Sequence, residues 1–434
     1  MKKNLFAYLG LKKIIFCLLW ASICNEAAAQ VNTDTTTLLW KDGYLDIHHI
    51  NTGRGVATFM MLPDGTTLVV DAGELDDSAG IRSFPLTVTT PYPDNSKTPA
   101  EWIADYIRQV YPATKKPVID YALITHYHGD HMGTISSQTK TARQGGYKLT
   151  GITELGELLP IKKLIDRDYP ANNFPVKLDR YYRKEPSIFN NLQKFITYQK
   201  AKNGLCAEAL VVGSAQQITL QHHPTQYPSF SVMGVKRNGT IWTGYSNNTF
   251  QYFTPDSVVT EKGTFNENPL SLAIKLTYGK FDYFTGGDNT GLQGYGLPQW
   301  FDVETPIAKA VGKVEVTTLN HHGNRDATNE NFLRALQPKV VVEQTWCSDH
   351  PGQEVMHRLI SDHLYNGEKN IFATNIQEAT KQTLGFWFTR GYKSLFGHVI
   401  IRVLPGGDQY YVFIAETINQ KITIKKVFGP YSSG

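Results

Sequence analysis

The sequence predicts an α/β fold, and two observations carry that prediction. Apolar runs typical of strands alternate with segments of helical spacing, and polar residues of the kinds found in functional sites recur directly after the apolar runs. The chain has 434 residues, 41% of them hydrophobic and 19% charged, which is enough to bury a large core without disulfides. Because the carboxyl ends of neighbouring strands meet at one edge of a sheet, we expect those polar residues to form one site.

The first elements are predicted to be two paired strands, a helix and a third strand. Residues 44–62 and 66–71 alternate apolar and polar side chains on either side of Pro63-Asp64-Gly65, which is a hairpin signal. A polar, proline-rich stretch at 83–98 predicts a loop, and residues 100–112 have apolar side chains at helical spacing. Residues 117–125 are typical of a buried strand, and a histidine cluster follows them.

The last third of the chain again shows strands that end in polar residues. Residues 270–288 predict two strands joined by a turn at 278–280, and residues 314–323 predict another strand. A short helix capped near Asn329 precedes a strand at 339–350, a helix at 350–365 and a hairpin at 397–415. The region 166–262 is rich in Tyr, Asn, Pro and Gly, and its pattern assigns no elements.

Residues 1–29 have the form of a secretory signal peptide. Four lysines flank or precede an apolar run at 14–24, and Ala27-Ala28-Ala29 supplies small residues for cleavage before Gln30. The apolar run is shorter than the roughly 20 residues that cross a bilayer, and no later stretch reaches that length. We therefore expect an exported protein, periplasmic or extracellular, whose mature chain of residues 30–434 is one soluble domain without a transmembrane segment.

Charge and cysteine content narrow the expected partners. Removing the leader's four lysines and Glu26 takes Lys+Arg from 43 to 39 and Asp+Glu from 39 to 38, so the mature chain is nearly neutral. The mature chain has no polycationic run that would bind a nucleic-acid backbone. We therefore expect a small-molecule or surface-polymer substrate. Cys206 and Cys347 are the cysteines beyond the leader, and one disulfide or two free thiols are both open.

Four residues that follow the strand at 117–125 have the spacing of a metal site. His126 and His128 are alternate residues on an extended segment, so their imidazoles point the same way and can share one ion. Asp130 and His131 follow a turn at Gly129 and face a neighbouring position, where they can hold a second ion. A lone histidine here would be interpreted as structural, but four potential ligands in this pattern predict a metal site.

The remaining ligands should come from other strand ends. Two adjacent ions need a bridging carboxylate, and Asp288 is the candidate, its alternative role being that of a turn aspartate. His321 or His322 and also His350 can supply imidazoles; because adjacent strand residues point oppositely, one of the first two binds metal and the other faces substrate or packs. Asp71 either orients the ligand loop or caps a turn.

Other residues of similar type are weaker candidates. The pairs His48-His49 and His222-His223 lack the strand-then-turn setting, so we expect them to be structural or solvated. Cys347 is close to the ligands in sequence, but a packing role is favoured. Three aromatic residues either line the pocket, where they can hold a cationic group, or pack in the core: Tyr295, Trp300 and Trp346.

These residues resemble the metallo-β-lactamase superfamily, whose hallmark His-x-His-x-Asp-His stands at residues 126–131. Six segments also run in the same order as in the extracellular metal domain of ComEC-type DNA-uptake proteins: LDIHHINTGRGVATFMMLPDGTTLVVDAG, THYHGDHMG, ELLPIKKLI, NENPLSLAIKLTYGKFDYFTGGD, LNHHG and SDHPGQEV. The phosphorylcholine esterases of bacterial surfaces are similar too. The segments span nearly the full length of the mature chain.

The resemblance implies an α/β fold of the αββα sandwich type with a dinuclear site for two divalent metal ions, zinc by analogy. The ligands that it implies are His126, His128 and His321 for one ion, and Asp130, His131 and His350 for the other. Asp288 would bridge the ions, and His322 would be free for substrate. Two insertions, at about 75–117 and 166–261, depart from the shared pattern and should shape the pocket. No membrane channel is present, so a role in DNA transport is not implied.

The expected activity is hydrolysis. Water bound to such an ion loses its proton near neutral pH and can attack phosphorus or a carbonyl carbon, and we expect Asp130 and His322 to act in catalysis. The leading hypothesis is a phosphoester or phosphodiester hydrolase, because the similar proteins act on phosphate esters. One alternative is hydrolysis of a carboxylic ester, lactone or amide, including a β-lactam. The other is a non-catalytic binding module stabilised by metal.

Overall fold

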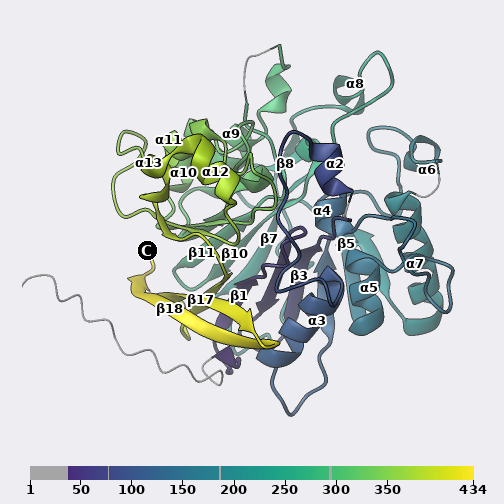
Figure 1. The fold of residues 1–434 in the computed structure, drawn as a ribbon, viewed down its shortest axis with the longest axis horizontal. Coiled ribbons are helices and arrows are strands. Elements are labelled where there is room, and N and C mark those ends of the chain that lie inside the picture. The colour runs from purple at the N-terminus through teal and green to yellow at the C-terminus, as the bar shows by residue number, and fades with distance from the viewer. Residues whose placement is uncertain (1–37, 77, 185–186, 293–295) are drawn as a thin grey trace, which may run out of the picture.

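A computed structural model describes residues 38–434 except 77, 185–186 and 293–295 (Figure 1). Two sheets form its centre, and each has nine strands. The strands of the first sheet, in spatial order, are β18 (Lys421–Ser432), β17 (Gln409–Ile418), β16 (His398–Val403), β1 (Leu45–His49), β2 (Ala57–Met61), β3 (Thr67–Ala72), β4 (Ile119–Leu123), β5 (Ile161–Asp166) and β6 (Cys206–Ala209). The signal peptide predicted at 1–29 lies outside the described residues.

The second sheet is assembled from the middle and the last third of the chain. Its strands, in spatial order, are β15 (Tyr392–Ser394), β14 (Asn370–Ala373), β13 (Val340–Glu343), β12 (Val316–Thr318), β11 (Phe281–Thr285), β10 (Ala273–Tyr278), β7 (Phe230–Arg237), β8 (Thr240–Trp242) and β9 (Thr249–Gln251). Both sheets are mixed: β3 to β6 are parallel in the first, and β11 to β15 are parallel in the second. The parallel parts direct several strand ends toward the same edge.

Helices cover the outer face of each sheet, as Figure 1 shows for α3, α5 and α7 on one side and α9, α10 and α12 on the other. The helices are α2 (Ala79–Ser83), α3 (Pro99–Val110), α4 (Gly129–Met132), α5 (Gly151–Leu158), α6 (Leu178–Tyr181), α7 (Ile188–Asn203), α8 (Pro255–Val258), α9 (Glu304–Val311), α10 (Glu330–Leu336), α11 (Gln353–Leu359), α12 (Glu378–Leu384) and α13 (Phe386–Thr389). Short 3₁₀ turns are η2 (Asn268–Leu270), η3 (Gln299–Phe301) and η4 (Asn320–Gly323). The αββα architecture expected from the sequence is confirmed.

Three apolar layers hold the sandwich together, and strand alternation assigns each residue to a layer. In β3, Leu68 and Val70 pack between the sheets, whereas Val69 packs against the helices of the first sheet. In β13, Val340 lies between the sheets and Val341 faces the helices of the second sheet. Each such side chain contributes about 1.5–3 kcal/mol by leaving water, so both faces of both sheets stabilise the fold.

Most of the elements that the sequence predicted are present, but three need correction. The stretch at 44–62 forms two strands, β1 and β2, instead of one, and the strand and helix predicted at 339–350 and 350–365 are the shorter β13 and α11. The hairpin break at Pro63-Asp64-Gly65 separates β2 from β3, and the turn at 278–280 joins β10 to β11. Helix α3 begins after Thr98, whose side chain accepts a hydrogen bond from the Glu101 amide at 3.1 Å while Glu101 reaches back to the Thr98 amide. Helix α10 is capped by Asn329, as expected.

The unassigned region contributes to both sheets. Residues 166–261 contain β6, β7, β8 and β9 together with α6, α7 and α8. Helix α7 is capped by Ser187 and ends at Gly204, which takes the left-handed conformation (φ 70°) that glycine adopts without strain. Its apolar side chains at Phe189, Leu192 and Phe195 pack under the first sheet. Among the described residues, no helix is both long and apolar enough to cross a bilayer.

Candidate metal centre

The polar residues predicted to form a site converge from three loops that leave the two sheets at one edge. The loop after β4 and the helix α4 carry residues 126–131, the loop after β11 carries Asp288, and η4 after β12 carries His321 and His322. The first loop belongs to the first sheet and the other two belong to the second sheet. The candidate site therefore lies between the sheets, where side chains of both can meet.

Six residues form two groups of potential ligands that share one carboxylate. Within each group the donor atoms all lie within 4.8 Å of one another; the groups are Asp130, His131, Asp288 and His322, and His126, His128 and Asp288. All of these side chains are buried except that of His128, which is half-buried. Converging imidazole nitrogens and carboxylate oxygens are the donor set that zinc and similar divalent ions take. The buried clusters can therefore bind a metal ion.

The two oxygens of Asp288 face different groups. Its Oδ1 lies 3.1 Å from Nε2 of His131, and its Oδ2 lies 3.6 Å from Nε2 of His126. On the first side, Nε2 of His322 is 3.0 Å from Oδ2 of Asp130. A carboxylate that presents one oxygen to each of two donor groups has the arrangement that a bridging ligand requires.

The pKa values of Asp288 and His322 shift in the direction opposite to the one that burial alone would cause. Burial disfavours the charge on Asp288, but His131, His322 and His126 hold the pKa of its carboxyl well below the usual range. Burial also disfavours a charge on His322, yet Asp288 and Asp130 raise its pKa to about 10. The buried carboxylates thus attract positive charge to the centre, which favours a cation there.

Two imidazoles are oriented by hydrogen bonds on their far sides. Nδ1 of His131 lies 2.8 Å from Oδ2 of Asp71, which also accepts a hydrogen bond from the Thr125 hydroxyl at 2.7 Å. Nδ1 of His322 lies 2.9 Å from the carbonyl oxygen of Gln344. These contacts hold a proton on Nδ1 and turn Nε2 toward the carboxylates of the donor group, as outer contacts of metal-binding histidines do. Asp71 therefore stands behind the donor groups, in the position of an orienting residue.

The backbone is strained at the residues that carry the centre. Asp71, His321 and His322 have φ values of 59°, 46° and 55°, which non-glycine residues rarely adopt. Each such residue costs about 1–3 kcal/mol, and strain of this kind concentrates at functional sites. Gly287, with φ 56°, precedes Asp288, and a Cβ there would lie 2.7 Å from the Cβ of Thr125. The close approach of these loops therefore requires glycine at this position.

The structure arranges the histidine pair and His350 differently from the ligand set that the resemblance implies. His322, not His321, contributes to a donor group, and His350 is in neither. The ring of His350 stacks on that of His322 at 4.7 Å. His321 instead pairs with Asp326, Nδ1 to Oδ1 at 2.5 Å, and its Nε2 lies 3.9 Å from Oδ2 of Asp288. His321 is also the more exposed of the pair.

Two further residues at the centre were missed or left open by the sequence. The amide nitrogen of Asn268 lies 3.0 Å from Nε2 of His321, and its Oδ1 has no hydrogen-bond partner among the described residues. A lone asparagine before a strand carries little signal, so only the resemblance to NENPLSLAIK pointed to this segment. The indole N–H of Trp346 donates to Oδ2 of Asp130 at 2.8 Å, so this aromatic residue contacts the site.

The remaining candidates lie elsewhere. The Trp300 ring packs on Phe253 at 5.1 Å, and Tyr295 lies outside the described residues. His49 hydrogen-bonds the Val399 carbonyl of the first sheet and the Tyr283 hydroxyl of the second, and neither it nor its neighbour His48 is in a donor group. His222 and His223 are exposed. In the described part of the chain, both cysteines are free thiols, the one at 206 exposed and the one at 347 buried.

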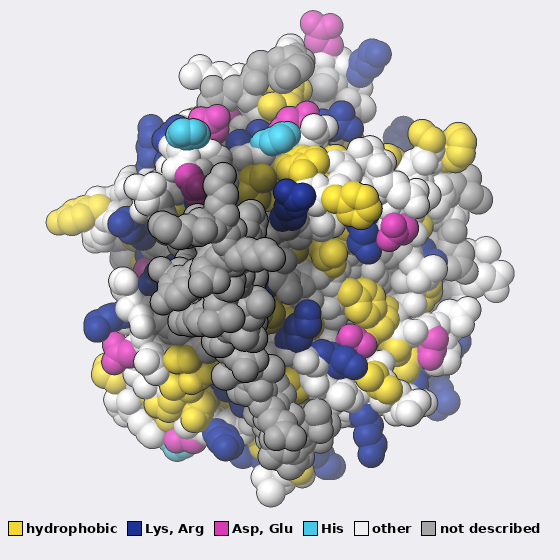
Figure 2. Space-filling model, turned by 60° about the vertical axis from the view of Figure 1, so that its left-hand side comes forward, with side chains coloured by type: hydrophobic (Ala, Val, Ile, Leu, Met, Phe, Trp, Pro, Cys, Tyr) yellow, Lys and Arg dark blue, Asp and Glu magenta, His cyan; other side chains and the backbone are white. Residues whose placement is uncertain are grey.

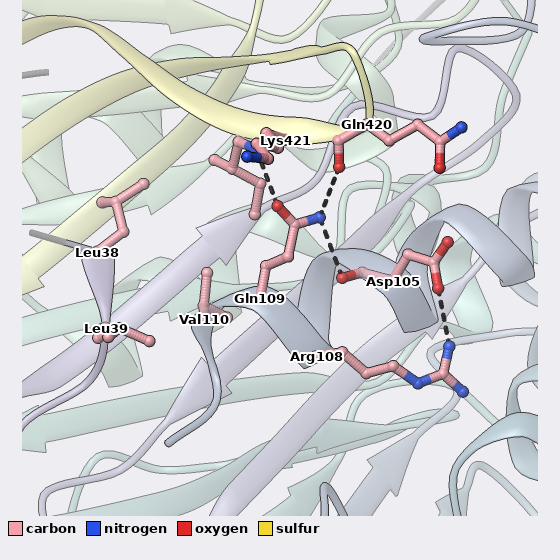
Figure 3. Close-up of a pocket in the computed structure, with 9 residues that line it drawn as sticks. Leu38, Leu39, Asp105, Arg108, Gln109, Val110, Gln420 and Lys421 are labelled. Atoms are coloured by element: carbon pink, nitrogen blue, oxygen red, sulfur yellow. Dashed lines mark hydrogen bonds and ion pairs between the residues drawn. The ribbon is translucent and has the colours of Figure 1, made fainter. Parts of the chain in front are cut away.

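Two cavities differ in whether the donor residues line them. A small cavity of about 20 Å³ lies behind Asp288, His131 and His322, between the two sheets. A larger one, of about 480 Å³, lies between α3 and the turn that joins β17 to β18 and contains no donor residue (Figure 3). There Gln109 bridges to the backbone of Gln420 at 3.0 Å. On the face drawn in Figure 2, lysine and arginine side chains are scattered among other types.

Comparison with known proteins finds no sequence match and only distant similarity to solved structures. No family model and no curated protein matches the chain. Zinc-bound PqqB from Methylobacterium extorquens is 9% identical with a TM-score of 0.38, covering 82% of this chain and 99% of that one. Yeast PDE1 is 12% identical with a TM-score of 0.34, covering 78% and 90%. A mutant CmlA beta-hydroxylase is 12% identical with a TM-score of 0.33 over 69% of this chain, which spans 45% of that protein's length. At these scores the similarity carries no inference about ligands or activity.

Proposed function

We propose that this chain is a metal-dependent hydrolase of the metallo-β-lactamase superfamily, with two zinc ions, that cleaves a phosphoester or phosphodiester. The observation that carries the proposal is the placement of Asp288, whose two oxygens face two groups of buried donors. A structural zinc site needs one ion and closes with four ligands, whereas a shared carboxylate is needed only when two ions are adjacent.

The proposed ligands follow the two donor groups. One ion is assigned to His126, His128 and Asp288, and the other to Asp130, His131, His322 and Asp288. Such ions, when bound, polarise the substrate and supply a nucleophile at neutral pH. The chain's own residues position and balance the charge of the site: Asp130 and Asp288 supply anionic oxygens, and Asp71 orients His131.

The two adjacent histidines exchange the roles that the resemblance implies. His322 is buried and close to Asp130, so it is assigned to a ligand position. His321 is held by Asp326, and its side chain is 18% exposed beside Asp288. We assign His321 to contact with the substrate, because its imidazole is oriented by a carboxylate and open to solvent.

The phosphoester substrate rests on the resemblance of the motifs to phosphorylcholine esterases and to the metal domain of ComEC-type proteins. Hydrolysis of a carboxylic ester, lactone or amide uses the same ions and is the alternative within enzymes. A non-catalytic binding module is the alternative outside them, and the shared carboxylate argues against it, because a module stabilised by metal has no need of a second ion.

The test measures metal content and turnover together. Elemental analysis of the purified protein should give about two metal ions per chain. Four chromogenic substrates separate the alternatives: bis(p-nitrophenyl) phosphate, p-nitrophenyl phosphorylcholine, p-nitrophenyl acetate and nitrocefin. We expect turnover of a phosphoester that is lost in His128→Ala and kept in His222→Ala, a change at an exposed histidine. Less than one ion per chain after zinc loading would favour the binding module.

The histidine roles have a separate test. His322→Ala should lose metal and activity together, because it removes a ligand. His321→Ala should keep its metal and lose turnover, because it removes only a contact with substrate. Loss of metal in His321→Ala with retention in His322→Ala would reverse the assignment.

We further propose that the protein acts outside the cytoplasm after removal of residues 1–29. The leader's lysines, apolar run and Ala27-Ala28-Ala29 support this. N-terminal sequencing of the protein from periplasmic and culture fractions should begin at Gln30. A cytoplasmic protein that retains Met1 would contradict export.

A further inference from the structure

A second pocket, lined by none of the metal donors, opens beside the candidate centre. Its volume is about 570 Å³, within the range of roughly 300–1,000 Å³ that is typical of small-ligand sites. Thr134 and Ile135 form one wall, and residues 180–184, from the end of α6 onward, form another. We infer that this pocket binds a second phosphate group of the substrate, other than the one that is cleaved. The inference rests on the proposed function.

Positive charge dominates the pocket. Arg180, Arg183 and Lys184 line it, and no described lining residue is acidic. Their side chains are exposed and, among the residues that the structure describes, have no ion-pair or hydrogen-bond partner. Asp179 is the acidic residue on α6, and it does not line the pocket. Three cations without a described counterion at one concave surface make a site for an anion.

A buried framework holds the basic segment in place. Tyr182, which lines the pocket, donates from its hydroxyl to Oε1 of Glu267 at 2.7 Å. Glu267 in turn pairs with the guanidinium of Arg167 at 2.6 Å, and both of these side chains are buried. The Tyr182 ring also stacks on that of Phe189 at 5.4 Å. The cations therefore project from a fixed wall, which lowers the entropy lost when they bind a ligand.

The pocket adjoins the metal centre on two sides. On the first, the Thr134 hydroxyl packs on Gly129, where a Cβ would lie 2.2 Å from it, and Gly129 stands between two donor residues, His128 and Asp130. On the second, the link is indirect: Tyr182 of the pocket wall is hydrogen-bonded to Glu267, the neighbour of Asn268, whose side-chain amide lies 3.0 Å from Nε2 of His321. A substrate held at the donor groups can therefore extend into the pocket.

The chemistry of the lining favours a phosphate over a carboxylate. A terminal phosphate carries nearly two negative charges near neutral pH, so it can be neutralised by more than one of these cations. Guanidinium groups bind phosphate through paired N–H donors, and lysine adds a point charge. The substrate class is thus a phosphoester that carries a further phosphate, as in a doubly phosphorylated nucleoside or sugar.

The experiment compares two substrates that differ by one phosphate. Thymidine 5′-(p-nitrophenyl phosphate) is assayed with and without a 3′-phosphate, and the ratio of their kcat/KM values measures the contribution of the second phosphate. We expect the wild-type protein to prefer the bisphosphate by about tenfold or more. The triple variant Arg180→Gln, Arg183→Gln, Lys184→Gln should bring the ratio near one, and added salt should reduce the ratio in the wild type but not in this variant.

A matched control removes the same charges elsewhere. Arg390, Lys425 and Lys426 are exposed and lie outside the pocket. The variant Arg390→Gln, Lys425→Gln, Lys426→Gln should keep the wild-type ratio and salt dependence. Equal loss in both triple variants would mean that overall charge, not the pocket, sets the preference, and would overturn the inference.

A binding measurement separates this inference from the proposed function. Calorimetry with thymidine 3′,5′-bisphosphate should give an affinity about tenfold weaker for the pocket variant than for the control variant. If neither ester is hydrolysed but this difference holds, the hydrolase proposal fails and the phosphate site stands. If esters are hydrolysed without preference and binding is equal in both variants, the phosphate site fails alone.

Discussion

Two groups of buried histidines in this protein have opposite electrostatics. His48, His49 and His398 lie inside the first sheet, where burial lowers the pKa of His49 to about 4 and that of His398 to about 3. His131 and His322 are equally buried at the sheet edge, yet neighbouring carboxylates raise the pKa of both. Burial of a histidine alone therefore does not mark a site; at His131 and His322, unlike at His49 and His398, neighbouring carboxylates outweigh it.

The largest effect should follow from removing the carboxylate that the edge histidines share. Asp288→Asn keeps the shape of the side chain but loses its charge, so we expect fewer than two metals per chain and a fall in kcat/KM of at least about 1,000-fold. Elemental analysis and phosphodiester kinetics measure both. Asp408→Asn, at an exposed aspartate, is the control. Full metal content in Asp288→Asn would show that the Asp288 carboxylate is not what makes the edge histidines, in contrast to those inside the sheet, a metal site.

Removing the orienting carboxylate should have the next largest effect. Asp71→Asn leaves one oxygen to serve both Thr125 and His131, so we expect metal affinity or activity to fall about 10- to 100-fold. Asp64 is the matched control, because it is a buried aspartate that accepts backbone hydrogen bonds in the hairpin turn between β2 and β3. A similar loss of activity in Asp64→Asn would mean that general stability, not orientation, explains the result.

The histidines inside the sheet should govern acid stability instead. Their folded pKa values lie below the unfolded value, so the unfolded chain takes up protons first as the pH falls below about 6.5. Stability is thus full above that pH and is lost progressively below it, by about 2 kcal/mol per histidine at pH 5. Urea unfolding at pH 7 and pH 5 measures the loss.

The variant that tests this is His398→Asn. Asparagine can still accept the hydrogen bond that the Asn51 amide donates to Nδ1 at 3.1 Å, but it does not titrate. We expect a smaller drop in stability between pH 7 and pH 5 than in the wild type. An unchanged drop would mean that other groups govern acid unfolding.

The smallest effect should come from removing the indole N–H of Trp346, which donates a hydrogen bond to Asp130. Trp346→Phe removes the N–H donated to Asp130 and keeps most of the apolar ring. A single hydrogen bond contributes about 1 kcal/mol, so we expect about a fivefold fall in kcat/KM with unchanged metal content. Trp300→Phe, whose ring packs on Phe253, should leave kcat/KM unchanged.

The sequence predicted the strand ends and the donors because both depend on short-range patterns. The spacing from His126 to His131 and the apolar strands before it are local, and the structure brings these residues together with Asp288. The elements of region 166–261 could not be predicted, because its local pattern is not regular. Helix α7 buries polar residues such as Asn191 and Gln199 among its apolar ones, which blurs the helical period.

The choice between His321 and His322 required the backbone conformation. Strand alternation predicted only that adjacent side chains point oppositely. Both residues instead have left-handed φ values, which turn the chain within two residues and bring His322 inward. The partners that favour this arrangement, the Gln344 carbonyl and Asp326, are distant in sequence or unremarkable in pattern. No local signal could have identified them.

The candidate centre draws Asp130 and His131 from a loop of the first sheet and Asp288 and His322 from loops of the second. An ion held by all four would be a crosslink between two halves of the sandwich that otherwise meet through apolar side chains and a few hydrogen bonds, such as that between His49 and Tyr283. Such a crosslink is reversible, so its strength depends on the free ion: at 100 times its Kd an ion adds about 2.7 kcal/mol to the folded state. The stability of this fold would then depend on the concentration of free metal ion around the protein.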